Sequence, residues 1–167
     1  QFGVLSLSRT NSNLLMWSHY ASSNTGYVIG FDDRHDFFRQ LDLENNIVRP
    51  LPVTYTEKRS HISQKHHNWY QKLLCEKPID WAYEEEERLF ITFPDKENVI
   101  GKDQYEMDII LTEIPADAIS EIFIGYKATK KTEEIIIDSA KKNKISCPIY
   151  KTSMSKTEYK IKFSQIN

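Results

Sequence analysis

The stretch Trp81-Ala82-Tyr83-Glu84-Glu85-Glu86-Glu87-Arg88 places four carboxylates and one arginine directly before the apolar run Leu89-Phe90-Ile91-Thr92-Phe93. The run is short, aromatic and branched, and this pattern predicts a buried strand. Glutamate is depleted in strands, and neighbouring like charges repel one another where water cannot solvate them. Acids next to a core strand therefore need either an exposed rim or a partner. The stretch predicts a catalytic or binding site at the end of a sheet, or alternatively a charged sheet edge.

Two local geometries are compatible with the acidic stretch. In the first, Asp80 caps a helical turn, and the glutamates lie near the positive end of that turn. In the second, the strand begins early, and its period of two places Glu84, Glu86 and Arg88 on one face. The guanidinium of Arg88 could then orient Glu86 or bind an anionic ligand. The simpler interpretation is a structural ion pair at the end of the sheet.

A second group of candidate residues lies in a predicted helix that follows the capping cluster Asn11-Ser12-Asn13. The helix carries Trp17-Ser18-His19-Tyr20 and has apolar residues on both sides, so we expect it to be largely buried. A buried histidine can act as a base or hold a ligand by hydrogen bonds. The alternative is that His19 is a core residue bonded to a backbone carbonyl, with Trp17 and Tyr20 serving only in packing.

Strands and helices are interspersed along the rest of the chain. Residues 27–31 are predicted to form a central strand, whereas Pro50 and Pro52 favour an edge position for the extended segment 48–55. Thr132 is the expected cap of a helix that runs to residue 143. Other strands are predicted at 3–8, 108–112, 121–126, 148–152 and 159–163, and other helical segments at 37–41, 62–76 and 115–118. This arrangement predicts an α+β fold with a mixed, mainly antiparallel sheet and about four helices.

Length and composition predict a single domain over residues 1–167, with enough apolar side chains for a packed core. The formal net charge of −2 provides no general attraction to nucleic acid, so we do not expect a nucleic-acid partner. The sequence contains no apolar segment long enough to cross a membrane, so no membrane association is expected.

Cysteine and histidine spacing gives no metal signature. Cys75 and Cys147 are far apart and match no metal-binding spacing, so a reducing cytoplasm is the expected location. Adjacent side chains on a helix diverge by about 100°, so His66 and His67 are not expected to share a metal ion. We interpret these two histidines and His61 as part of a solvated surface.

Several segments together resemble a bacterial family. They are Val4-Leu5-Ser6-Leu7-Ser8, Asn13-Leu14-Leu15-Met16-Trp17-Ser18-His19-Tyr20-Ala21, Gly26-Tyr27-Val28-Ile29-Gly30-Phe31-Asp32, then Trp81, Tyr83-Glu84, Glu86 and Arg88, and finally Ile119, Glu121-Ile122 and Gly125. The combined pattern resembles the bacterial domain-of-unknown-function family two-nine-seven-one, which is similar to the abortive-infection AbiGi proteins. The resemblance implies a bacterial protein linked to phage defence and supplies no established reaction. Family members usually carry a further N-terminal section, and we expect that this chain, which begins at Gln1, lacks it.

The enzyme hypothesis is a nucleotide-using transferase that resembles ADP-ribosyltransferases. Those enzymes combine a small α+β fold with aromatic residues that pack a nicotinamide ring, a polar orienting residue and one catalytic glutamate. By this resemblance, Glu86 is the catalytic carboxylate, which stabilises an oxocarbenium-like centre or activates the acceptor, and NAD is the expected cosubstrate. His19 is assigned to the catalytic site, where it positions the ligand. The predicted ligand-binding residues are Trp17, Tyr20, Glu84 and Arg88.

The alternative hypothesis is a non-catalytic protein-interaction module of a defence or toxin–antitoxin system. Trp17 and His19 are then core residues. The acidic segment forms a recognition rim for a basic protein partner, and charge reversal at Glu84 and Glu86 is expected to abolish binding.

Overall fold

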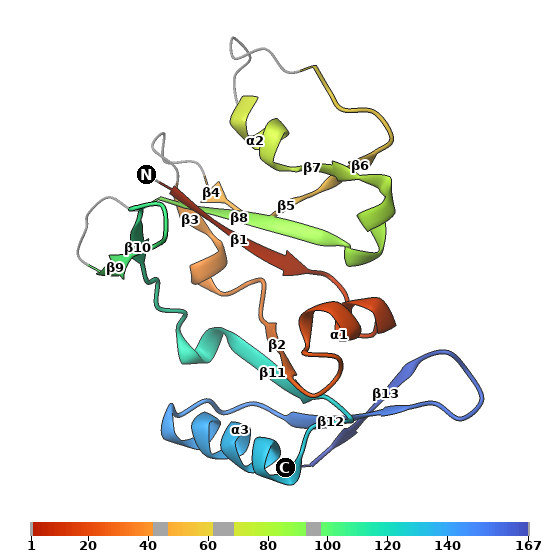
Figure 1. Cartoon of the computed structure of the whole chain (residues 1–167). Coiled ribbons are helices and arrows are strands. Elements are labelled where there is room, and N and C mark those ends of the chain that lie inside the picture. The colour runs from red at the N-terminus through yellow and green to blue at the C-terminus, as the bar shows by residue number, and fades with distance from the viewer. Residues whose placement is uncertain (1, 42–46, 62–68, 93–97, 167) are drawn as a thin grey trace.

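The apolar residues Ile122, Phe123 and Ile124 form the centre of a four-stranded sheet, and all three are buried. The computed structural model describes residues 2–41, 47–61, 69–92 and 98–166. The strand order of this sheet is β13-β12-β11-β2, in which only β11 and β12 run parallel (Figure 1). Its strands are β2 (Tyr27–Phe31), β11 (Ile119–Ile124), β12 (Ile149–Met154) and β13 (Ile161–Gln165), and the crossover from β11 to β12 is α3 (Lys130–Lys142).

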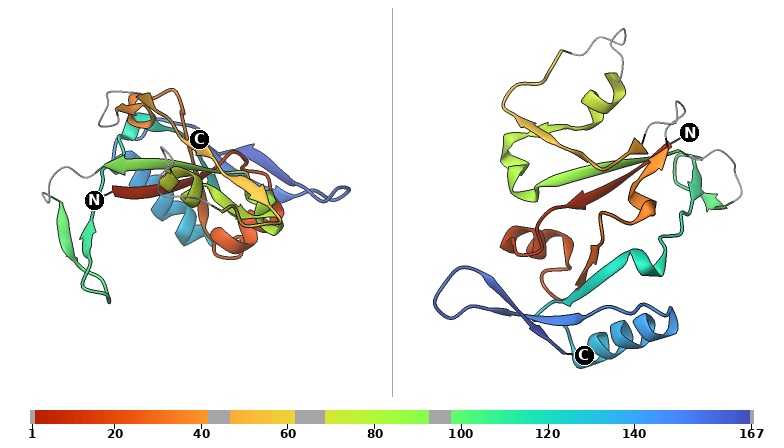
Figure 2. Two further views of the ribbon diagram at one scale, coloured as in Figure 1. Left: turned by 90° about the horizontal axis from the view of Figure 1, so that it is seen from above. Right: turned by 180° about the vertical axis from the view of Figure 1, so that it is seen from behind.

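A separate antiparallel sheet has the order β1-β8-β5. Its strands are β1 (Phe2–Ser8), β5 (Leu51–Pro52) and β8 (Glu86–Thr92). The views in Figure 1 and Figure 2 show β1 between β8 and β2, so that the edges of the two sheets lie next to each other. The buried core of this sheet consists of Phe38, Leu89, Ile91 and Ala118.

Several short elements lie between these strands along the chain. They are α1 (Leu14–Tyr20), η1 (Asp36–Phe38), β3 (Gln40–Leu41), β4 (Ile47–Val48), β6 (Thr54–Thr56), α2 (Trp69–Leu74), β7 (Glu76–Pro78), η2 (Ile79–Glu84) and η3 (Ala116–Ala118), where η denotes a 3-10 helix. β3 pairs antiparallel with β4, and β6 pairs in parallel with β7. Among the described residues, no helix is both long and apolar enough to cross a membrane.

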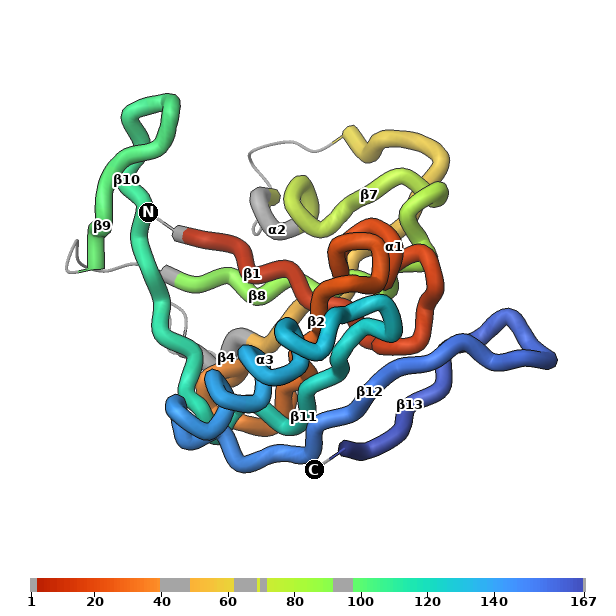
Figure 3. Tube along the Cα trace, turned by 60° about the horizontal axis from the view of Figure 1, so that its bottom comes forward, coloured from red at the N-terminus to blue at the C-terminus, as the bar shows by residue number. Residues whose placement is uncertain are grey.

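A two-stranded hairpin of β9 (Val99–Lys102) and β10 (Asp108–Ile110) extends away from both sheets. Figure 3 shows this hairpin and the connection between β12 and β13 on opposite sides of the molecule. Several large apolar side chains of the hairpin region are exposed, namely Val99, Ile100, Tyr105, Met107, Ile109 and Leu111.

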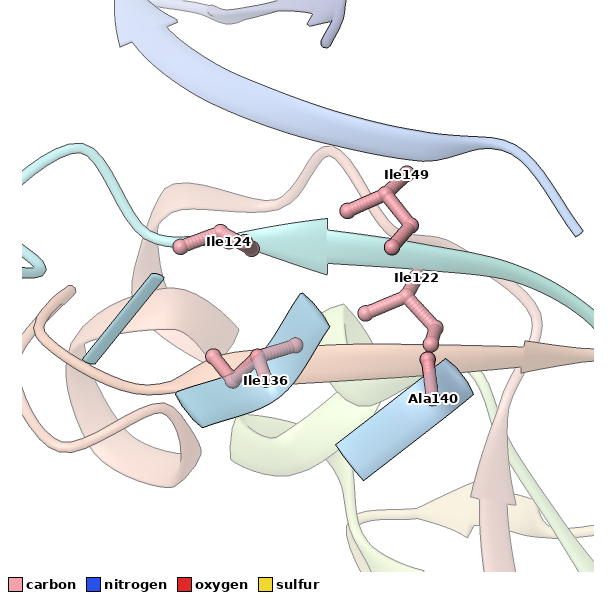
Figure 4. Packing of buried hydrophobic residues seen from close by; sticks show 5 residues of the cluster. All are labelled: Ile122, Ile124, Ile136, Ala140 and Ile149. Carbon is pink, nitrogen blue, oxygen red and sulfur yellow. The ribbon is translucent and has the colours of Figure 1, made fainter. Parts of the chain in front are cut away.

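Alternation along β11 directs its side chains to two different helices. Ile122 and Ile124 pack with Ile136 and Ala140 of α3 and with Ile149 of β12, as Figure 4 shows. On the opposite face, Phe123 joins a cluster with Trp17, Ala21 and Ile161. The four-stranded sheet is therefore covered by α3 on one face and by the region of α1 on the other, which fixes α1 relative to the rest of the fold.

The predicted α+β class with mainly antiparallel sheets is confirmed. The strand 27–31 forms as predicted, but it lies at the edge of its sheet and is not central. A continuous apolar run indicates burial but not the position of a strand within a sheet. The cap of α3 is Thr129, whose hydroxyl accepts from the backbone N–H of Thr132, the residue predicted to be the cap.

Two helical predictions also need correction. α1 has a single buried residue, Trp17, whereas Leu15, His19 and Tyr20 are exposed, so this helix is amphipathic and not largely buried. Of the helix predicted at 62–76, residues 62–68 lie outside the described residues and α2 covers Trp69–Leu74. The following residues, Glu76–Pro78, form β7 because they pair with β6.

Candidate functional site

A cleft of about 840 Å³ lies where the edge strands β1 and β2 face each other. Its volume falls within the range of ordinary ligand pockets, about 300–1,000 Å³. β1 contributes residues 5–8 and β2 contributes most of its length. Four charged side chains also line the cleft, and they are Lys77, Glu84, Glu86 and Arg88.

The local backbone explains how two glutamates reach one cleft. Glu84 ends η2, and Glu85 adopts a left-handed conformation with φ 45° before β8 begins at Glu86. Both predicted geometries therefore hold in part. A helical turn precedes the strand, although Pro78 and not Asp80 occupies its cap position. The strand then places Glu86 and Arg88 on one face by its period of two.

Two side chains hold η2 against the rest of the fold. Asn13 caps α1 by accepting from the N–H groups of Leu15 and Met16, and its Nδ2 donates to the carbonyl of Tyr83 at 3.1 Å. The hydroxyl of Ser8 in β1 donates to the carbonyl of Glu84 at 2.7 Å. Both contacts fix the backbone that carries Glu84, so the cleft wall is built by residues distant in sequence.

The two carboxylates are buried in a network with two cations. Glu84 is 3% exposed and Glu86 is 7% exposed. Arg88 donates from Nε to Oε1 of Glu86 at 2.8 Å and from Nη2 to Oε2 at 2.9 Å. The Lys77 ammonium lies 3.2 Å from Oε2 of Glu86 and also bonds to Oε2 of Glu84. Two negative and two positive charges therefore compensate each other, as buried charges require.

Neutral groups complete the hydrogen bonding of the network. The Tyr20 hydroxyl donates to Oε1 of Glu84 at 2.7 Å, and the Ser6 side chain bonds to the Glu86 carboxylate. The backbone N–H of Glu86 donates to the Tyr55 hydroxyl at 2.8 Å. Both carboxylates are thus held in fixed orientations at the cleft wall.

These contacts shift the pKa values of Glu86, Lys77 and Tyr20. Burial alone would raise the pKa of Glu86, but hydrogen bonds from Arg88, Ser6 and Lys77 outweigh burial and hold the pKa at about 2. Burial opposes the charge of Lys77, yet its hydrogen bonds to the two glutamates raise its pKa above the ordinary value. The hydrogen bond to Glu84 raises the pKa of Tyr20. At neutral pH, Glu86 is an anion and Lys77 a cation.

Five of the six predicted site residues come together in this cleft, and they are Trp17, Tyr20, Glu84, Glu86 and Arg88. Trp17 is 1% exposed and donates its indole N–H to the Asn11 carbonyl at 2.6 Å. His19 is exposed and does not line the cleft. The prediction that it is buried is therefore wrong, both for a buried ligand-site histidine and for a core histidine bonded to a backbone carbonyl. Two helix positions rotate a side chain by about 200°, so the face that buries Trp17 turns His19 outward.

The sequence interpretation missed Lys77, Ser6 and Tyr55. Lys77 comes directly after the helix predicted at 62–76, and its place in the network depends on the parallel pairing of β7 with β6. Ser6 reaches Glu86 because the β1–β8 register places Ser6 opposite Arg88. The available signal was that two buried carboxylates need cations, but this requirement does not identify which lysine supplies one.

The described residues contain no group of three or more His, Cys, Asp or Glu side chains placed to hold a metal ion. His66 and His67 lie outside the described residues, and His61 is exposed. The side chains that line the cleft offer two fixed carboxylates, two cations and several hydroxyl groups.

Comparison with family models finds one match, to the family described as "Protein of unknown function (DUF2971)", over residues 16–89. No curated protein and no solved structure matches the chain. The matched range begins within α1 and ends within β8, so it includes Trp17, Tyr20 and all four charged residues of the cleft. Residues 16–89, which carry the charged network of the cleft, match the DUF2971 family of proteins of unknown function.

Proposed function

We propose that the cleft between β1 and β2 binds a ribosyl nucleotide such as NAD and that the protein is a transferase similar to ADP-ribosyltransferases. One observation carries the proposal. Glu86 is an oriented, ionised carboxylate in the wall of a ligand-sized cleft. A fixed negative charge in a water-poor site stabilises positive charge that develops on a bound sugar.

The protonation of Glu86 favours one of the two roles considered for it. A general base works best when its pKa lies near the working pH, and a pKa of about 2 makes Glu86 a poor proton acceptor. An electrostatic role requires only that the carboxylate stays charged. We therefore assign Glu86 to stabilisation of an oxocarbenium-like centre, with Arg88 and Lys77 as positioning residues.

The proposed transfer breaks the bond between the ribose C1′ carbon and the nicotinamide nitrogen. The bonding electron pair leaves with nicotinamide, which becomes neutral, and the sugar carbon acquires the positive character that Glu86 faces. A nitrogen or oxygen atom of the acceptor, or of water, then forms the new bond to C1′ and releases its proton to solvent. No oxidant or reductant is needed.

The biological setting proposed for this activity is phage defence, which rests on the resemblance to abortive-infection proteins. A bacterial strain expressing the wild-type protein is expected to survive phage challenge better than one expressing Glu86→Gln at equal protein level. Equal survival of the two strains would contradict the proposed role in phage defence but would not test the proposed reaction.

The test of the enzymatic proposal is release of nicotinamide from NAD, measured by mass spectrometry together with NAD binding by calorimetry. Glu86→Gln keeps the shape of the side chain, and we expect turnover to fall at least 100-fold. Glu134→Gln on the exposed surface of α3 is the matched control and should keep wild-type turnover. The proposal fails if the wild type does not consume NAD, or if folded Glu86→Gln protein turns over NAD normally.

Of the acidic recognition rim in the alternative hypothesis, Glu85 is exposed but its neighbours Glu84 and Glu86 are not. Glu84 and Glu86, the residues on which that hypothesis depends, are buried and paired with Lys77 and Arg88. A basic partner would have to break these pairs before it could contact either carboxylate, and breaking a buried pair costs several kcal/mol, about 3–5.

A further inference from the structure

Four aromatic rings form a row on the surface next to the cleft. The ring centroids of Trp81 and Tyr83 are 6.0 Å apart, and those of Tyr83 and His19 are 6.4 Å apart, with an interplanar angle of 34° in both pairs. Tyr20 follows His19 at 6.4 Å with an angle of 69°. We call Trp81, Tyr83, His19 and Tyr20 the aromatic row.

The row is accessible to solvent. Trp81 is 38% exposed, Tyr20 is 61% exposed and His19 is also exposed, while Tyr83 is half-buried. None of the four rings belongs to a buried core cluster among the described residues. Large aromatic surfaces left in water next to a cleft are typical of sites that take up a flat apolar ligand group.

Both ends of the row connect to the buried Glu84, one directly and the other through Lys77. At one end, the Tyr20 hydroxyl donates to Glu84 at 2.7 Å. At the other end, the Lys77 ammonium lies 4.9 Å from the centroid of the Trp81 ring and also bonds to Glu84. A ligand that covers the row therefore has its next group within reach of the cleft in which Glu84 and Glu86 lie.

We propose that the aromatic row is a stacking platform for the base of a nucleoside whose ribose enters the cleft. Planar bases stack on aromatic side chains largely independently of their sequence identity, because every base has a π-face. Ribose hydroxyls can form hydrogen bonds with hydroxyl side chains that line the cleft, such as those of Ser8 and Thr10. This inference rests on the proposed function in that both use a ribosyl ligand, and it adds the residues that hold the base.

The stacking platform predicts a difference in affinity between adenosine and ribose, which the transferase proposal does not predict. Adenosine carries a base and a ribose, whereas ribose alone has no ring to stack. Adenosine is therefore expected to bind at least about five-fold more tightly than ribose, because stacking on one aromatic ring contributes a factor of roughly 5 to 150. Binding is measured by calorimetry and by quenching of tryptophan fluorescence, and Trp81→Phe shows which part of the signal comes from Trp81, because Trp17 and Trp69 also fluoresce.

Substitutions separate stacking from other effects. Trp81→Leu and Tyr83→Leu should each weaken adenosine binding roughly ten-fold, whereas Trp81→Phe retains a ring and should keep most of the affinity. Tyr159→Leu is the control, because Tyr159 is 97% exposed and lies outside the row. Circular dichroism checks that each variant folds. If Trp81→Leu does not fold, Tyr83→Leu tests the aromatic row instead, because it leaves Trp81 and its contact with Lys77 in place.

The outcomes distinguish the two proposals. If the wild type does not consume NAD but binds adenosine through Trp81 and Tyr83, the transferase proposal fails and the platform is supported. If NAD is consumed and Tyr83→Leu leaves both its KM and adenosine affinity unchanged, the platform is overturned and the transferase proposal stands. Equal binding of ribose and adenosine, or binding of neither, also overturns the platform.

Discussion

Arg88 and Glu86 form a two-point hydrogen-bonded pair, with distances of 2.8 Å and 2.9 Å, although only one residue separates them in β8. Residues two apart share a face of a strand, so the strand itself aligns the guanidinium with the carboxylate. The pair lies at the wall of the cleft, where the Glu86 side chain is 8% exposed and the Arg88 side chain 19% exposed. The orientation of Glu86 is thus set mainly by its own strand.

We expect Arg88→Met to lower the free energy of unfolding by about 3–5 kcal/mol, because it leaves a buried carboxylate with only Lys77 and Ser6 as side-chain partners. Urea unfolding measures the loss. Arg34→Met is the matched control, since Arg34 also bonds to a carboxylate through Nε and Nη2 but is 79% exposed, and its substitution should not change stability measurably. Equal losses in the two variants would contradict a buried, stabilising pair.

Stability should fall in acid because of Glu86. Its pKa in the folded protein, about 2, is lower than its ordinary value of 4.5, so its contribution is fully present above pH 4.5 and is lost as the pH falls towards 2. The shift corresponds to about 3 kcal/mol at neutral pH. Unfolding free energies measured between pH 6 and pH 2.5 should therefore fall less in Glu86→Gln than in the wild type. Parallel curves for the two proteins would show that Glu86 titrates normally.

Tyr20→Phe should lower the free energy of unfolding by about 1–2 kcal/mol, because the buried Glu84 carboxylate loses one donor while the aromatic ring remains. Thermal and urea unfolding provide the measurement. Tyr159→Phe removes a hydroxyl from a residue that is 97% exposed and serves as the control, for which no change is expected.

Asn13 performs two tasks that different substitutions separate. Asn13→Ala removes both the cap of α1 and the bond to the Tyr83 carbonyl, and it should cost about 2 kcal/mol. Asn13→Ser keeps a capping oxygen but is too short to replace the Nδ2 bond, so about half of that loss is expected. Thr129→Ala, which removes only the cap of α3, should cost about 1 kcal/mol. Equal losses for the two Asn13 variants would mean that the link to η2 adds no stability.

Much of the local structure followed from short-range patterns. Asn13 caps α1, β8 is a buried strand, and Glu86 lies on the same face as Arg88, as the alternation of residues predicted. The requirement that acids beside a core strand need a partner also proved correct. The exposed side of α1 was not recognised, because apolar residues such as Leu15 remain in water on that face.

The identity of each partner depended on contacts over long sequence separations. Tyr20 and Glu84 are 64 positions apart, and the pairing of β1 with β8 brings Ser6 opposite Arg88. The spacing of residues along the chain predicts neither contact, because strand pairing and register are set by the packing of the whole sheet.

The order of amino acids alone was sufficient for the α+β class, the capped helix α1 and the Glu86–Arg88 pair, since all three depend on neighbours a few positions apart. Only the tertiary structure placed Lys77 between two glutamates and His19 at the surface. It also brought the edges of the two sheets together, so that a cleft forms between them. The physical reason is desolvation. Glu84 and Glu86 can be buried only where positively charged side chains from other elements pair with them. These contacts exist only once the chain has folded.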